Sequence, residues 1–284
     1  MRRDLVLSVG TIGDVDFGER VEAAVAGGYH GIGMSVGVAR RAREGRWDWA
    51  SMRALLDSYG LRVVELDSVV DWAVADRAAL QRHCEHLFTI ADELGGEYLL
   101  ACTDVPTTNT SETTDRLTWI CAEARRHGVG VGVEFLPWVS VNSIPAAEEL
   151  ARRAAASNAG IIIDVWHFLR AGGTLEHLAA MDPELVLGIQ ISAPALEPAD
   201  DPIFETLHRR HLPGDKDAVD ILPVLRALLR SDVRAPWAVE VFSDTLRNLP
   251  AAEAALSAAT AAQQALEQAS TTQEVKTVGP QHLR

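Results

Sequence analysis

Four polar residues end short apolar segments in the second half of the chain, and each offers an oxygen atom to a metal ion. They are Glu134, Asp164, Gln190 and Glu240, which close residues 129–134, 160–164, 187–190 and 237–240. Burying a carboxylate or carboxamide without a partner costs free energy, so four such ends suggest one shared site. Oxygen donors favour Mg²⁺ or Mn²⁺ over Zn²⁺, which prefers nitrogen and sulfur. The alternative for each residue taken alone is a separate hydrogen bond or salt bridge.

Four further residues have side chains that suit a substrate pocket. His167 follows Asp164 by three residues, and a neutral imidazole there can donate a hydrogen bond or move a proton. Arg210 lies in a Pro-containing segment, where its guanidinium could bind a hydroxyl, carboxylate or phosphate. Trp138 and Trp166 follow apolar segments and could wall a sugar-sized pocket. A helix-capping histidine, a solvated arginine and core tryptophans are the alternative interpretations.

Short strand-like segments alternate with helical spacing along the chain. We expect strands at residues 5–8, 31–34, 62–66, 98–102, 129–134, 160–164, 186–192 and 238–241. We expect helices at residues 17–26, 49–58, 77–94, 113–126, 146–155 and 219–229, several of them ending at glycine. Eight strand-then-helix units predict a parallel α/β sheet closed into a (β/α)8 TIM barrel, whose C-terminal rim would hold the four polar ends.

Side-chain alternation within the strands supports the barrel. Counting back by two from each polar end places Gly132, Ile162, Gly188 and Ala238 on the inward face, where small residues suit a tight interior. The opposite faces carry valine and isoleucine, which suit packing beneath helices. An open doubly wound sheet is the alternative, but the glycines at residues 10 and 13 lack its phosphate-binding spacing. Glu65, near the end of the third strand, fits either face.

Length and composition predict one domain. The chain has 284 residues, 48% of them hydrophobic, and one α/β barrel needs about 250 residues. We expect the barrel to span residues 1–262 and a polar tail without a catalytic role to span residues 263–284. The longest loop, residues 193–217, follows the seventh strand and is expected to cover the active site.

The charge and the cysteines narrow the range of partners. A formal net charge of −14 argues against nucleic-acid and anionic-membrane binding. The three cysteines, Cys84, Cys102 and Cys121, form no CxxC pair and favour reduced thiols in the cytoplasm. The N-terminal residues contain no long apolar stretch, so we expect neither a signal peptide nor a membrane anchor. A homo-oligomer stays open.

At these residues the chain resembles the xylose-isomerase-like TIM barrel superfamily, and within it the sugar phosphate isomerase/epimerase group. The resemblance spans about residues 5–260 and rests on residues 133–138, 158–173, 189–192, 210–215 and 239–243. It implies a metal held by Glu134, Asp164, Gln190 and Glu240, with the two glutamates as a proton-transfer pair and with His167 and Arg210 as substrate contacts. Many members have histidine at the position of Gln190, and glutamine there is similar to hydroxypyruvate-isomerase-like members. The lid departs from the usual pattern at Ala193 and at residues 216–217.

The sequence therefore predicts a metal-dependent isomerase or epimerase of a sugar-like small molecule, with Mn²⁺ or Mg²⁺ as the cofactor. Proton transfer next to a carbonyl would form an enediolate, which the metal stabilises. Loss of a β-hydroxyl instead would make the protein a dehydratase of a keto-polyol or a dehydroshikimate-like acid. A non-catalytic barrel subunit is a further alternative, although all four ligand positions are ligand-capable. An apurinic-site endonuclease is disfavoured by the acidic charge and the oxygen-only ligands.

Overall fold

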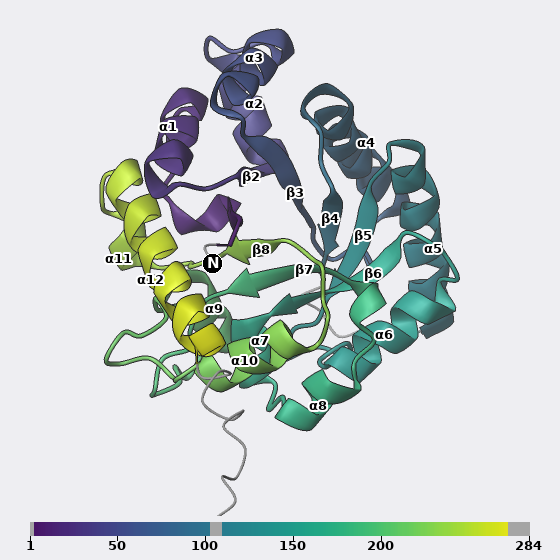
Figure 1. The fold of residues 1–284 in the computed structure, drawn as a ribbon. Coiled ribbons are helices and arrows are strands. Elements are labelled where there is room, and N and C mark those ends of the chain that lie inside the picture. The colour runs from purple at the N-terminus through teal and green to yellow at the C-terminus, as the bar shows by residue number, and fades with distance from the viewer. Residues whose placement is uncertain (1–2, 103–109, 272–284) are drawn as a thin grey trace, which may run out of the picture.

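The computed structural model describes residues 3–102 and 110–271, which form a closed barrel of eight parallel strands surrounded by helices (Figure 1). Neighbouring strands in the sheet follow one another in the chain, and the last strand pairs with the first. The predicted single-domain TIM barrel is thus confirmed. The strands are β1 (Leu5–Leu7), β2 (Gly31–Ser35), β3 (Arg62–Val69), β4 (Tyr98–Ala101), β5 (Gly130–Glu134), β6 (Ala159–Asp164), β7 (Val186–Ile191) and β8 (Trp237–Val239).

The helices begin and end at residues that satisfy their free backbone groups. The side chains of Asp16, Asp48 and Asp76 accept hydrogen bonds from first-turn N–H groups, and Gly28 and Gly60 end two helices with a positive φ. No helix in the described ranges is both long and apolar enough to cross a bilayer. The helices are α1 (Phe17–Gly27), α2 (Val36–Glu44), α3 (Trp49–Tyr59), α4 (Arg77–Leu94), α5 (Thr110–Arg126), α6 (Ile144–Arg153), α7 (Val165–Arg170), α8 (Leu175–Ala180), α9 (Pro202–His208), α10 (Leu222–Arg230), α11 (Asp244–Arg247) and α12 (Ala251–Thr271), with 3₁₀ turns η1 (Val9–Thr11) and η2 (Pro183–Leu185).

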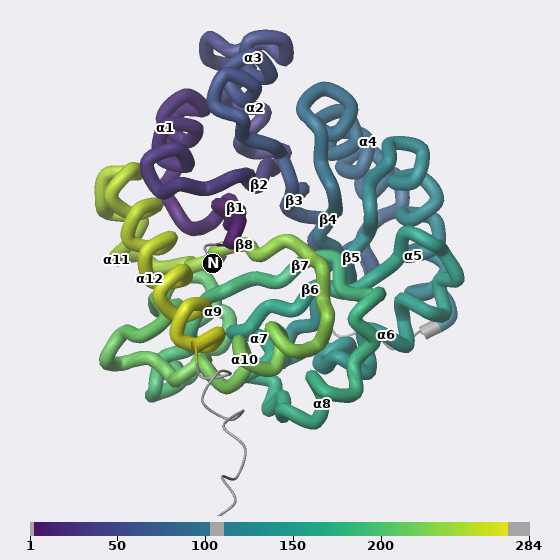
Figure 2. Tube along the Cα trace, in the orientation of Figure 1, coloured from purple at the N-terminus to yellow at the C-terminus, as the bar shows by residue number. Residues whose placement is uncertain are grey.

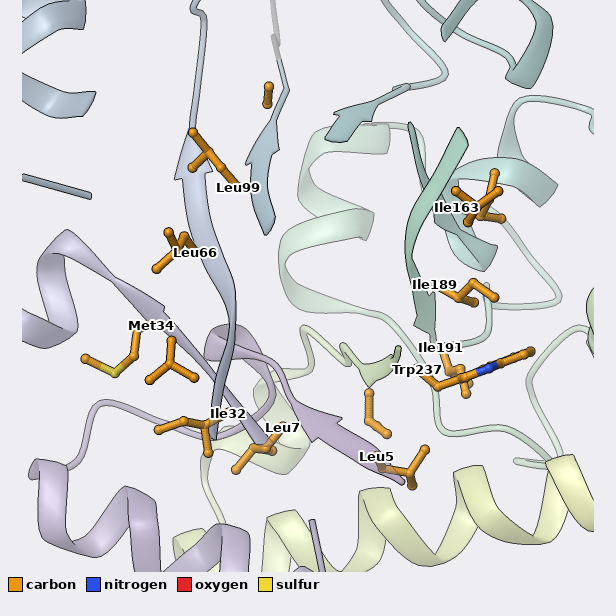
Figure 3. Close-up of a cluster of buried hydrophobic side chains, with 14 of the residues drawn as sticks. Leu5, Leu7, Ile32, Met34, Leu66, Leu99, Ile163, Ile189, Ile191 and Trp237 are labelled. Carbon is orange, nitrogen blue, oxygen red and sulfur yellow. The ribbon is translucent and has the colours of Figure 1, made fainter. Parts of the chain in front are cut away.

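Alternation along the strands creates two apolar cores. The large core lies between strands and helices, and Figure 3 draws 14 of its residues and labels ten, among them Ile163, Ile189 and Ile191. The small core fills the barrel interior and contains Ile162 and Ala238, as the alternation predicted. Its members are Val6, Val64, Tyr98, Leu100, Ile162 and Ala238. Alternate residues at the ends of the late strands therefore face different cores, which fixes the direction of the polar residues there. β7 departs from the alternation only at its start, where a register shift against β6 lets Val186 face the large core and Leu187 the small one.

Helix α12 extends past the boundary expected at residue 262. It continues to Thr271 because Ala265, Leu266 and Ala269 recur at helical spacing and are buried. The carboxamide of Gln263 accepts from the backbone N–H of Arg3 at 3.3 Å and donates to the Arg3 carbonyl at 2.6 Å. Figure 2 shows α12 running beside α1, against which it packs. The first nine residues of the expected tail are thus helical, and residues 272–284 lie outside the described residues.

The long loop after β7 has its own structure. It contains α9, and two isolated bridges tie Ala193 to His211 and Ala195 to Ala218. Arg170, the last residue of α7, fastens the loop to the barrel: its guanidinium donates to the buried carboxylate of Glu205 and to the Ala195 carbonyl at 2.7 Å. These contacts hold the loop against the C-terminal rim of the barrel, where it returns Arg210 to the strand ends.

Candidate active site

Glu134, Asp164, Gln190 and Glu240 lie at the C-terminal ends of β5, β6, β7 and β8. Glu134 and Asp164 are the last residues of their strands, Gln190 is the second-last residue of β7, and Glu240 directly follows β8. Asp164 and Gln190 are register partners, and Gln190 Nε2 donates to Glu240 Oε1 at 2.9 Å. All four are buried, with exposed fractions of 8% or less. The sequence predicted these four as one site, and the structure places them at adjacent strand ends.

Arg210 supplies the positive charge of the cluster. Its Nη1 donates to Asp164 Oδ2 at 2.6 Å and to Glu240 Oε2 at 3.0 Å, so one guanidinium links two of the predicted ligands. Thr206 fixes the same guanidinium, because its carbonyl accepts from Nε and its hydroxyl accepts from Nη2. The ring of Phe242 lies 5.0 Å from the guanidinium carbon. Arg210 is therefore a buried, positioned cation rather than a solvated lid residue.

His167 lies between Arg210 and Glu134. Its Nε2 is 3.2 Å from Arg210 Nη2 and 3.6 Å from Glu134 Oε1, and its backbone N–H donates to Asp164 Oδ1 at 3.0 Å. A guanidinium can only donate, so Nε2 accepts and the ring proton sits on Nδ1. Nδ1 is buried and has no hydrogen-bond partner in the described part of the chain. Burial lowers the pKa of His167 to about 3, so the ring is neutral near pH 7 and offers a free N–H.

Trp138 and Trp166 flank the imidazole. Their ring centres lie 5.8 Å and 5.1 Å from that of His167, both in edge-to-face geometry. Trp166 is fully buried and stands 5.4 Å from the Arg210 guanidinium carbon, whereas Trp138 is half-buried. Their indole N–H groups have no hydrogen-bond partner within the described residues. The two rings form an aromatic wall on the His167 side of the cluster.

Burial dominates the electrostatics of the carboxyl groups. Desolvation raises the pKa of Glu134 well above its usual range, and the Asp164 charge adds to the shift. Desolvation also raises the pKa of Glu240, although Arg210 opposes the shift. Burial disfavours the charge of Asp164 too, but Arg210 and the hydrogen bond from the His167 backbone N–H outweigh it and lower its pKa. Asp164 is thus the ionised member of the cluster, and the two glutamates can each hold a proton.

The donor set suits a divalent cation. Ligand atoms of Glu134, Asp164 and His167 lie within 4.8 Å of one another, and Gln190 Oε1 is buried without a hydrogen-bond partner among the described residues. Carboxylates with a spare carboxamide oxygen match the hard oxygen ligands that Mg²⁺ and Mn²⁺ prefer, and an imidazole also admits Zn²⁺. His167, expected only as a substrate contact, lies within reach of the ligands, but its Nε2 accepts from Arg210 in this arrangement and would bind a cation only after giving up that bond.

The sequence left the direction of Glu65 open, and it missed the role of Thr206. Glu65 is fully buried inside the barrel, where its Oε2 accepts from Tyr98 Oη at 3.0 Å and from Gln190 Nε2 at 3.3 Å. Burial, with the nearby Asp67, raises the pKa of Glu65 to about 7. No sequence pattern marks Thr206. It holds Arg210 only because α9 places the two residues next to each other.

With the fold and the cluster established, the chain can be placed among known proteins. Residues 21–267 match the family described as xylose isomerase-like TIM barrel, so the chain belongs to that family. The solved structure of the IOLI protein with a bound zinc atom is similar in fold, with a TM-score of 0.83 and 21% identity. That match covers 94% of this chain and 99% of the other.

Two curated relatives are enzymes. The 3-dehydroshikimate dehydratase of Pseudomonas aeruginosa is 29% identical over 240 residues, which cover 82% of this chain and 37% of the dehydratase. The inosose isomerase of Bacillus subtilis is 30% identical over 143 residues, about half of each chain. The chain thus spans little more than a third of the dehydratase it matches.

Proposed function

We propose that this chain is a divalent-metal-dependent enzyme that removes a proton next to the carbonyl of a polyhydroxylated keto substrate. The observation that carries the proposal is the pair of buried glutamates beside the Asp164–Arg210 ion pair. Glu240 Oε2 accepts from Arg210 at 3.0 Å, and a carboxyl oxygen of Glu134 lies within 4.8 Å of one of Asp164. Burial raises the pKa of both carboxyl groups in the metal-free protein, and a carboxylate next to a substrate carbon can take a proton from that carbon and return it.

Each residue of the cluster has a role in this proposal. Glu134, Asp164, Gln190 and Glu240 would hold the metal, which polarises a carbonyl and stabilises the negative charge that develops when the proton leaves. One glutamate accepts the proton and the other donates one. The neutral His167 donates a hydrogen bond from Nδ1 to a substrate oxygen. Arg210, whose N–H groups already bond to Asp164, Glu240, Thr206 and His167, holds these groups in position around the substrate. The wall of Trp138 and Trp166 excludes water from the side of His167.

Dehydration is the first outcome to test, because the similarity to 3-dehydroshikimate dehydratase extends over 82% of the chain. In that reaction one glutamate takes the proton from carbon and the other protonates the departing β-hydroxyl, so that one water leaves. Isomerisation or epimerisation is the second candidate, favoured by the similarity to inosose isomerase. There the proton returns to the neighbouring carbon or to the opposite face of the same carbon, with the same two residues.

The test is proton exchange in deuterated water. The protein with Mn²⁺ is incubated with 3-dehydroshikimate, an inosose or a ketose, and NMR follows deuterium uptake while absorbance follows formation of an aromatic dehydration product. We expect turnover with one of these compounds and a loss of about 10²–10⁴-fold on Glu240→Gln. The surface variant Glu253→Gln, on α12, serves as the matched control. Wild-type exchange rates in the Glu240→Gln variant would contradict the mechanism.

A further inference from the structure

Glu65, Tyr98 and Gln190 form a hydrogen-bonded chain inside the barrel, next to the proposed ligands. Tyr98 Oη and Gln190 Nε2 both donate to Glu65 Oε2, at 3.0 Å and 3.3 Å. Gln190 Nε2 also donates to Glu240 Oε1 at 2.9 Å. The three side chains are buried, with exposed fractions of 1% or less. Water therefore does not compete for these bonds, and the two carboxyl groups decide how the carboxamide of Gln190 is turned.

The chemistry of a carboxamide gives this contact a direction. The nitrogen carries two hydrogens and the oxygen carries none, so only Nε2 can face two accepting carboxyl oxygens. Glu65 and Glu240 thus hold the nitrogen between them, and Oε1 must point away from both. Oε1 is buried and without a hydrogen-bond partner among the residues that the structure describes. A carboxamide turned by half a rotation would present N–H groups, which cannot bind a cation.

Two glycines in the strands make room for the hydrogen-bonded side chains of Glu65, Tyr98 and Gln190. A Cβ at Gly33 would lie 3.1 Å from Glu65 Oε1, and a Cβ at Gly188 would lie 2.7 Å from the Tyr98 ring and hydroxyl. Gly188 precedes Gln190 by two residues on β7, so the strand that carries the carboxamide also admits the tyrosine. The barrel interior is thus shaped to hold Glu65 beside Gln190.

We propose that Glu65 is a positioning residue that fixes the carboxamide of Gln190 with its oxygen toward the metal. The proposal rests on the metal site of the proposed function. Partners that orient a ligand from behind commonly change metal affinity by 10–100-fold when they are removed. Because a carboxylate has two equivalent oxygens, it needs no partner to choose between them, and this difference allows a test.

The experiment compares Mn²⁺ binding, measured by electron paramagnetic resonance, in four proteins: wild type, Glu65→Leu, Gln190→Glu and the double variant. We expect Glu65→Leu to weaken Mn²⁺ binding by about 10–100-fold when residue 190 is glutamine. In the Gln190→Glu background the same substitution should weaken binding much less. The loss of the Glu65 charge at the metal acts in both backgrounds, so their difference reports the contact between residues 65 and 190, which orients a carboxamide in one background and places two carboxyl groups together in the other.

The outcomes separate the two proposals. Wild-type protein that binds neither Mn²⁺ nor Mg²⁺ contradicts the proposed function. Wild-type protein that binds Mn²⁺, with equal losses in both backgrounds, contradicts the positioning role alone. Circular dichroism checks that each variant folds. If Glu65→Leu does not fold, the isosteric Glu65→Gln replaces it, and a smaller loss confined to the Gln190 background is then expected because a neutral carboxamide is a weaker acceptor.

Discussion

The carboxyl groups of the site outnumber its cations. Glu134, Asp164 and Glu240 are buried around one guanidinium, that of Arg210, and the nearby His167 is neutral. Folding therefore removes three carboxyl groups from water while pairing only part of their charge. The arrangement favours a divalent cation and costs stability without one. The carboxyl groups proposed to bind the metal should accordingly lower the free energy of unfolding when no metal is bound.

Glu134→Gln should stabilise the metal-free protein, and the effect should depend on pH. The pKa of Glu134 is raised in the folded state, so above about pH 4.5 only the unfolded chain loses this proton, and stability falls as pH rises toward the folded pKa. Glutamine has no such proton. Urea unfolding in EDTA should show a gain of about 1–3 kcal/mol at pH 7 and none at pH 4. An equal gain at both values would contradict this account, and Glu253→Gln on the surface should change neither.

The sequence predicted the polar residues at the strand ends, but not that Arg210 would pair with two of them. The positions of Glu134, Asp164, Gln190 and Glu240 follow from strand alternation, which is local. The place of Arg210 depends on how residues 193–217 fold over the rim, and nothing near Arg210 in the sequence records that path. The cation that pairs with Asp164 therefore became visible only in the structure.

Among the elements, β3 shows where alternation fails. The register between β2 and β3 shifts at a bulge, where Ile32 pairs with Val63 and Gly33 pairs with Glu65. The extra residue lets Val63 and Leu66 both face the helices, while Val64 and Glu65 face the interior. Strict counting by two would place Glu65 with Val63, on the helix side. A bulge is set by the neighbouring strand, so the sequence alone could not place this carboxylate.

The short helices were missed for a related reason. Helices α7, α9 and α11 have 6, 7 and 4 residues, which is too short for an apolar period to repeat. Their starts depend on side chains such as Asp164 and Asp201, which cap α7 and α9. The long helices α1, α3 and α4 were predicted to within one residue at each end.

Gly188→Ala should destabilise the barrel. A methyl group there meets the Tyr98 ring at 2.7 Å, and the ring is enclosed by the interior core, so strand or ring must move. We expect a loss of about 1–3 kcal/mol in the free energy of unfolding, measured with urea. Gly37→Ala is the control, because its neighbours lie at 3.4 Å or more and α2 gains a better helix former. Equal effects of the two substitutions would argue against the crowding.

In the molecule as a whole, the residues of the proposed active site and the contacts that close the barrel lie in different parts of the structure. The site uses the C-terminal ends of β5 to β8, whereas α12 packs along α1 and its Gln263 bonds to the backbone of Arg3 (Figure 2). Arg3 immediately precedes the segment that leads into β1, where the sheet closes onto β8. We call the contact of Arg3 with Gln263, beside the β1–β8 pairing, the seam. Substitutions at the seam should therefore change stability and leave metal binding unchanged.

Gln263→Ala should lower the free energy of unfolding by about 1–2 kcal/mol, because two backbone groups of Arg3 lose a partner that is partly shielded from water. Its neighbour Gln264 is exposed, so Gln264→Ala should have little effect. Urea unfolding measures both, and Mn²⁺ titration of the folded variants should match wild type. A Gln263→Ala variant with weakened Mn²⁺ binding would show that the seam and the rim are coupled.

The paired bonds between Arg3 and Gln263 also bear on topology. They join the segment before β1 to the helix after β8, so the last unit meets the first much as any unit meets the next. A ring of eight similar units has no intrinsic starting point, and the closed sheet leaves no edge that must come first or last. The order of the units around the barrel axis places the strands that carry the proposed ligands side by side. A circular permutation of the chain would preserve that order.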